Sequence, residues 1–187
     1  ANSHTDRKLD PEKLKAELNT YLPEDIGVDR VEKVPERFHS RLNALGKTYR
    51  YRVATGEGKN VFERKQIYPL NQPLDVEAMR LGAALLVGEK DFRGFSSMKK
   101  TKKSTVRRLE SVKIWELPGE VEFDFTGNGF LYNMVRILTG TLLEIGMGKR
   151  EPESIGEVFQ KNDRNLAGFT APARGLTLVE VFYPKNS

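Results

Sequence analysis

The sequence contains no cysteine and only two histidines, His4 and His39. Without cysteine, the chain cannot form a disulfide framework, a thiolate zinc site or a cysteine nucleophile. The two histidines are too few and too far apart along the chain to indicate a metal cluster. We therefore expect no metal site.

Long apolar runs are also absent. No stretch approaches the roughly 20 residues of a membrane-spanning helix, and the first residues show no signal-peptide pattern. We therefore expect a soluble, cytoplasmic protein that does not enter a membrane. The chain begins at Ala1 without an initiator methionine, which is compatible with removal of that methionine or with a fragment of a longer protein.

Positive charge is concentrated in one segment. The formal net charge is +5, yet six cations lie between residues 99 and 108 with no acidic residue among them. They are Lys99, Lys100, Lys102, Lys103, Arg107 and Arg108. A local cluster of this kind suits contact with a phosphate backbone. The alternative is a solvated lysine-rich loop, which is common on proteins that bind no nucleic acid.

The most informative segment runs from Gly127 to Gly146. It predicts a strand end, a Gly/Asn turn and a long helix, because its apolar residues recur at helical spacing. These residues are Leu131, Val135, Leu138, Leu142 and Ile145. Gly140 would let another backbone or a ligand approach this helix closely.

Arg136 lies roughly opposite that apolar stripe, and no acidic residue occupies a helical spacing from it. Burying an unpaired guanidinium is expensive, so its anionic partner must come from elsewhere. The alternatives are a structural ion pair or an arginine whose charged end reaches solvent.

The other patterns alternate between strands and helices. We expect helices over 11–22, 76–87 and 152–160, and strands over 25–34, 48–54, 109–115, 121–125 and 176–183. In the first helix Leu14 and Leu18 should face inward, and the second helix, capped by Asp75, carries Met79, Leu81, Leu85 and Leu86. This order predicts an α+β fold of the split βαβ, ferredoxin-like type, an antiparallel sheet with helices on one face.

Five collinear segments resemble the TruA-type tRNA pseudouridine synthases. They are Phe38-His39-Ser40-Arg41 with Lys47 to Tyr51, then Leu86 to Phe95, then Val106-Arg107, then Asn128 to Lys149, and finally Thr170 to Leu178. The resemblance extends from about residue 10 to Pro184 and departs from the family pattern at Lys90 and Gly129, where His and Ala are usual. It implies the pseudouridine synthase catalytic fold.

The family's G-R-T-D-x-G-V-H-A block, which carries its nucleophilic aspartate, is absent from these 187 residues. Asp6 lacks the flanking glycines and the following Val-His. The resemblance therefore implies the C-terminal portion of such an enzyme, with residues 1–45 a connecting helix and strand and residues 46–187 the α+β core. We expect this portion to be inactive alone.

The resemblance implies conversion of uridine to pseudouridine in tRNA, generally in the anticodon stem-loop, without cofactor, metal or redox change, by a homodimeric enzyme. It implies that Arg136 pairs with the nucleophilic aspartate and that Tyr49 holds the base and relays its C5 proton. Arg41 would lie near the RNA and the flipped base, and Leu176 and Leu178 would contact the base. From the residues alone, Tyr49, Leu176 and Leu178 are also ordinary strand positions and Arg41 an ordinary surface residue.

Two other classes of function remain open from the residues. One is a non-catalytic RNA-binding module, for which Tyr49 and Tyr51 offer two rings on one strand. No glycine-aromatic RNP1 signature surrounds them, however. The other is a structural or small-ligand α+β protein, since a fold does not decide function.

Overall fold

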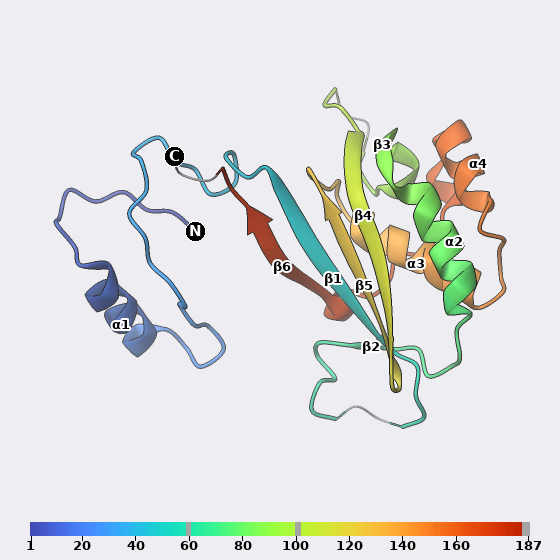
Figure 1. Cartoon of the computed structure of the whole chain (residues 1–187), viewed down its shortest axis with the longest axis horizontal. Helices are drawn as coiled ribbons and strands as arrows, with labels where there is room; N and C mark the ends of the chain where they lie inside the picture. Colours follow the sequence, from blue (N-terminus) through green and yellow to red (C-terminus); the bar gives the residue numbers. More distant parts are fainter. Residues whose placement is uncertain (59–60, 100–101, 185–187) are drawn as a thin grey trace. The chain divides into compact units, whose positions relative to one another are not determined.

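The computed structural model describes residues 1–58, 61–99 and 102–184 (Figure 1). The chain divides into two units, Ala1–Ala44 and Leu45–Ser187. Within the described residues, no helix combines the length and the apolar character needed to cross a membrane.

The first unit contains helix α1 (Pro11–Tyr21). Asp10 caps it by accepting a hydrogen bond from the Glu12 N–H, and Pro11 occupies the first turn. No residue of α1 is buried, so the expectation that Leu14 and Leu18 face a core is wrong. Two leucines one turn apart form too narrow an apolar stripe to bury a helix face.

The strand expected over 25–34 is also wrong, because these residues are irregular. The side-chain amide of Asn19 takes the place of a partner strand at Val28. Its Nδ2 donates to the Val28 carbonyl at 2.9 Å, and its Oδ1 accepts from the Val28 N–H at 2.7 Å. This backbone is therefore satisfied by a side chain rather than by a sheet.

The second unit is built on a six-stranded sheet. Its strands are β1 (Gly46–Ala54), β2 (Tyr68–Pro69), β3 (Gly88–Asp91), β4 (Val106–Leu117), β5 (Glu120–Gly127) and β6 (Leu176–Phe182). The order is β2-β1-β5-β4-β3, and β6 also pairs with β1. All pairs are antiparallel except β1 with the short β2. The sheet is thus antiparallel as expected except for this short pair, where the chain returns beside the end of β1 in the same direction.

Three helices cover one side of this sheet (Figure 1). They are α2 (Val76–Leu86), α3 (Met134–Gly146) and α4 (Ser154–Lys161). Three short 3-10 turns complete the unit, η1 (Arg93–Phe95), η2 (Arg164–Leu166) and η3 (Ala173–Gly175). The architecture is therefore mixed α+β, with the core between the sheet and α3.

Alternation along the strands supplies the sheet side of that core. Tyr51 of β1 and Phe123 and Phe125 of β5 are fully buried on the helix-covered face, as the spacing predicts. Arg50 and Arg52 of β1 lie on the other face, where Arg50 binds Asp124 and Arg52 binds Glu120. Each arginine is thus partly buried beside an acidic residue of the neighbouring strand.

Helix α2 starts as expected, because the Asp75 side chain accepts from the Ala78 N–H at 2.9 Å. Met79 and Leu86 are buried, but Leu81 is 65% exposed and Leu85 is 42% exposed. A helix that turns Met79 and Leu86, seven residues apart, toward the sheet must turn Leu81 and Leu85 away from it.

Helix α3 is buried almost all round. Every one of its residues is buried except Arg136 and Glu144. The five predicted apolar positions are all buried, although Leu131 precedes the helix. A Cβ built on Gly140 would overlap the carbonyl oxygen of Phe169. The expected close approach of another backbone at Gly140 is therefore confirmed.

Replacing Gly140 with Ala should lower the free energy of unfolding by about 3 kcal/mol, at the upper end of the cost of overpacking, because a backbone carbonyl cannot move aside cheaply. Gly156→Ala is the matched control, since nothing lies within 4 Å of a Cβ at that α4 position. The control should gain about 0.5–1 kcal/mol from helix propensity. Urea unfolding measures both, and equal effects would contradict the close contact at Gly140.

Candidate functional site

The candidate site is formed by β1, the start of α3 and β6, all in the second unit. Tyr49 of β1 is half-buried, and its ring meets that of Phe130 edge-on, with 5.2 Å between centroids and 88° between planes. Phe130 comes from the turn that precedes α3, so an aromatic contact joins the strand to the beginning of the helix.

Strand β6 brings the two predicted leucines to the same face. Leu178 pairs opposite Tyr49, and Leu176 pairs opposite Tyr51. Residues opposite one another on paired strands share a face. Leu176 is half-buried and packs against the core, whereas Leu178 is 48% exposed. Leu178 and Tyr49 thus form a partly open apolar surface, while Leu176 also has a packing role.

Arg136 lies in the first turn of α3 and is half-buried. Its Nε donates to the Ala171 carbonyl at 2.6 Å, and its Nη1 donates to Asn133 Oδ1 at 3.0 Å. The Ala171 N–H donates back to the Arg136 carbonyl at 3.1 Å. In the described part of the chain no carboxylate pairs with Arg136. Neutral acceptors therefore orient this guanidinium without neutralising it.

Tyr51 fixes the segment that supplies Ala171. Its hydroxyl donates to the Pro172 carbonyl at 2.6 Å. Burial raises the pKa of Tyr51 well above its ordinary value, and the nearby positive charge of Arg136 opposes this rise only in part. The hydroxyl consequently stays protonated and remains a donor. The chain also passes so close to the ring that a Cβ on Gly175 would lie 2.7 Å from it.

Four partners in this arrangement were not predicted from the sequence, namely Phe130, Asn133, Tyr51 as a hydrogen-bond donor and the Ala171 carbonyl. Asn133 alone carried a local signal, because it precedes Arg136 by three positions, a spacing that brings side chains together on a helix. The Ala171 carbonyl lies 35 residues from Arg136 along the chain, and no local pattern points to such a contact.

Two of the six cations, Arg107 and Arg108, lie on opposite faces of β4. Arg107 pairs opposite Lys90, and the next residue, Arg108, pairs opposite Glu89. Successive strand residues point to opposite faces, so the two arginines diverge. Arg107 is half-buried and donates to the Ser104 carbonyl at 3.0 Å. Contact of the six cations with an RNA backbone stays a prediction.

Three lysines of this group, Lys99, Lys102 and Lys103, lie on the loop before β4. Lys99, Lys102 and Lys103 are exposed, and Lys100 lies outside the described residues. The start of the loop is tied to the turn before α3, because the Ser97 N–H and the Ser96 hydroxyl both donate to the Tyr132 carbonyl, at 3.2 and 3.1 Å. The lysine loop therefore begins beside the end of α3 that carries Arg136.

Arg41 belongs to the first unit, where it is exposed and its N–H donates to His39 Nδ1 at 3.1 Å. Its contact with RNA stays a prediction.

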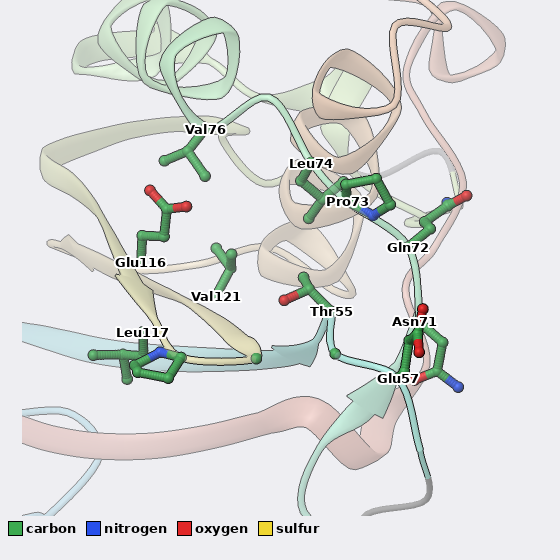
Figure 2. Close-up of a pocket in the computed structure, with 13 residues that line it drawn as sticks. Thr55, Glu57, Asn71, Gln72, Pro73, Leu74, Val76, Glu116, Leu117 and Val121 are labelled. Atoms are coloured by element: carbon green, nitrogen blue, oxygen red, sulfur yellow. The ribbon is translucent and has the colours of Figure 1, made fainter.

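A cavity of about 560 Å³ lies beside the C-terminal end of β1 and the turn between β4 and β5 (Figure 2). Glu57 and Glu116 contribute carboxylates to its wall, and Leu74, Val76 and Val121 contribute apolar surface. None of the predicted site residues lines it. Two carboxylates would repel a phosphate backbone, so this cavity is not a candidate RNA site.

Comparison with known proteins gives a consistent result. A family model described as tRNA pseudouridine synthase matches residues 83–184. A Bacillus cereus protein named tRNA pseudouridine synthase A 1 is 45% identical over 166 residues, covering 89% of this chain and 67% of the relative. A Clostridium tetani protein named tRNA pseudouridine synthase A 2 is 42% identical over 183 residues, covering 98% of this chain and 74% of the relative.

Proposed function

The chain belongs to the tRNA pseudouridine synthase family, and from that premise we propose that the site on β1, α3 and β6 receives a tRNA uridine for isomerisation to pseudouridine. The observation that carries the assignment of the site is Arg136, a guanidinium oriented by neutral acceptors with no carboxylate partner among the described residues. The positive charge of Arg136 is therefore available to pair with an anion from another segment.

The reaction explains what each residue would do. The N1–C1′ bond of uridine breaks, the uracil turns, and C5 bonds to C1′ while the proton leaves C5 and N1 gains one. The uridine must first leave its stack to be reached. Arg136 would pair with the nucleophilic aspartate and keep its pKa low, so that it is ionised at neutral pH. Tyr49 would lie against the base and relay the C5 proton, and Leu178 and Leu176 would provide apolar contact.

We propose that the nucleophilic aspartate is supplied by a segment outside these 187 residues. Two facts support this. The family block that carries the aspartate is missing from the sequence, and the chain covers 67% of the Bacillus cereus relative and 74% of the Clostridium tetani relative. Residues 1–45 would then connect the two parts, and residues 46–187 would form the C-terminal α+β core.

The finer fold assignment is likewise a proposal. The strands β6-β1-β5-β4 are adjacent in that order, with α2 between β1 and β4 in sequence and α3 between β5 and β6. This arrangement supports a split βαβ core with β2 and β3 as additions. Homodimerisation and action on the anticodon stem-loop rest on the family resemblance alone.

A non-catalytic RNA-binding module is the competing proposal, and the burial of β1 argues against it. An RNP-type surface exposes two rings on a strand for base stacking. Here Tyr51 is fully buried and Tyr49 is half-buried against Phe130.

The direct test of the proposed reaction is release of tritium from tRNA labelled at uridine C5 by the complete synthase. Absence of release would exclude the proposed reaction.

The lysine loop predicts a steep salt dependence of tRNA binding. Replacing Lys99, Lys100, Lys102 and Lys103 together with Gln should reduce the steepness of log affinity against log salt by about 3. Each phosphate contact that is lost leaves roughly 0.7–0.9 counterions bound to the RNA. Fluorescence anisotropy with labelled tRNA between low and moderate salt measures the slope. A control variant carries Gln at four other lysines, Lys65, Lys113, Lys149 and Lys161. Equal slopes in both variants would identify the loop as a solvated surface.

A further inference from the structure

Arg136 and Glu144 are the two residues of α3 that are not fully buried. They lie near opposite ends of the helix and bind the same loop. This loop, residues 163–172, returns past α3 before β6 begins. Arg136 binds it at Ala171, through the contacts of 2.6 and 3.1 Å described above. Glu144 binds it at Phe169, whose N–H donates to Oε1 at 3.1 Å.

Arg150 extends the contact at the Glu144 end. Its Nε lies 2.9 Å from Glu144 Oε2, and its Nη1 donates to the Leu166 carbonyl at 2.9 Å. The Nε–H has no well-directed acceptor among the described residues, so the pair is held by charge rather than by a hydrogen bond. Both side chains are about four-fifths buried, at 18% and 21% exposed. An ion pair buried to this extent is costly to break by removing one partner.

The middle of the loop packs directly against α3. The Gly168 N–H donates to Thr141 Oγ1 at 2.9 Å, and a Cβ on Gly168 would lie 2.6 Å from the Thr141 backbone. Phe169 in turn lies against Gly140. The backbone is therefore pressed onto α3 from residue 168 to residue 169.

Phe169 donates to Glu144, and Ala171 accepts from Arg136. Only one residue lies between Phe169 and Ala171 in the chain. Two residues of extended chain span at most about 7 Å, so a shift at Phe169 passes to the Ala171 carbonyl with little loss. The Arg136 side chain has only Ala171 and Asn133 to orient it in the described part of the chain. The direction of its guanidinium thus depends on where the loop lies.

We propose that Glu144, together with Arg150, is a positioning residue for Arg136: it anchors the loop whose Ala171 carbonyl aims the guanidinium into the site. The proposal rests on the function proposed above for Arg136. In this proposal Glu144 acts through the loop and not by contact with the substrate. Its negative charge also offsets the desolvation of Arg164, whose Nη2 donates to Thr170 Oγ1 at 3.1 Å.

Two variants separate the contacts of Glu144. Glu144→Leu removes both the acceptor for Phe169 and the charge that faces Arg150. Glu144→Gln keeps an acceptor for Phe169 and removes the charge, so it should have an intermediate effect and remains informative if the leucine variant does not fold. Glu120→Gln is the matched control, because Glu120 forms a similarly buried pair with Arg52, at 14% and 21% exposed, on the other face of the sheet.

The first measurement is the NMR signal of the Arg136 Nε–H in this chain, assigned by its loss in Arg136→Lys. The hydrogen bond to Ala171 should protect this proton from exchange with water. We expect its exchange to be at least about 10-fold faster in Glu144→Leu, less affected in Glu144→Gln and unchanged in Glu120→Gln. Unchanged exchange in both Glu144 variants would overturn the proposal.

The second measurement is single-turnover and steady-state kinetics of the complete synthase. We expect kcat to fall about 10- to 100-fold in Glu144→Leu, because small misplacements of a catalytic group cost that much, with KM for tRNA changed less than about twofold. A faster-exchanging Arg136 proton with kcat intact would also overturn the proposal. If Arg136→Met itself left kcat intact, the proposed function of Arg136 would fail, and the exchange measurement would still decide whether Glu144 orients it.

Discussion

The 187-residue chain alone is expected to convert no detectable uridine in tRNA to pseudouridine. It supplies Arg136, Tyr49 and the apolar surface around Leu178, but the family block that carries the nucleophilic aspartate is not in the sequence. Loss of a nucleophile typically costs about four to six orders of magnitude in rate. The residues that remain can bind and orient the uridine, but they cannot replace the atom that forms the covalent bond.

The measurement is pseudouridine formation in unmodified tRNA after prolonged incubation with the chain, with the complete synthase as the positive control. Binding of the same tRNA should persist through the lysine loop, which separates loss of chemistry from loss of folding. Clear turnover would show that another acid serves as nucleophile. Asp6→Asn would then test the aspartate that lies nearest in sequence to the expected position.

Replacing Arg136 with Met in the complete synthase should lower activity by at least about 100-fold, equivalent to about 3 kcal/mol of transition-state stabilisation. Without the guanidinium, the aspartate loses its charge partner, its pKa rises and its orientation loosens. The effect on folding should be much smaller. The chain loses the hydrogen bonds to Ala171 and Asn133, and a net cost of about 1 kcal/mol is typical of such a loss.

The paired measurements are thermal unfolding of this chain and single-turnover kinetics of the complete synthase. Arg136→Lys is the control, because it keeps the positive charge but loses the planar fork that binds Ala171 and Asn133 together. It should recover part of the activity if charge dominates. A large loss of stability with activity per folded molecule intact would make Arg136 structural.

Elements defined by contacts within a few residues were predictable. Asp10 and Asp75 mark helix starts because a cap needs only the next turn. The β4–β5 hairpin follows from two alternating runs around Pro118-Gly119, where Gly119 takes a φ of +73° that favours glycine. The apolar stripe of α3 follows from the helical period in the same way.

Predictions failed where a distant partner decides the outcome. Residues 25–34 have an apolar pattern, but Asn19 rather than a strand pairs with Val28. The four apolar residues of α2 likewise did not indicate which side would be buried: Met79 and Leu86 are buried, whereas Leu81 and Leu85 are exposed. A pattern shows that a residue suits burial, and only the neighbouring element determines which side of a helix is buried.

By itself the sequence determined the family resemblance, the main strands and helices and the need of Arg136 for a partner. These depend on residue identity and on spacing within one element. The tertiary structure alone decided that the Ala171 carbonyl orients Arg136, that Leu178 lies opposite Tyr49 and that Arg107 and Arg108 diverge. It also revealed Glu144 as the second anchor of the same loop. The physical reason is that strand register and loop position are set by packing and hydrogen bonds between residues far apart in the chain, and local periodicity contains no record of them.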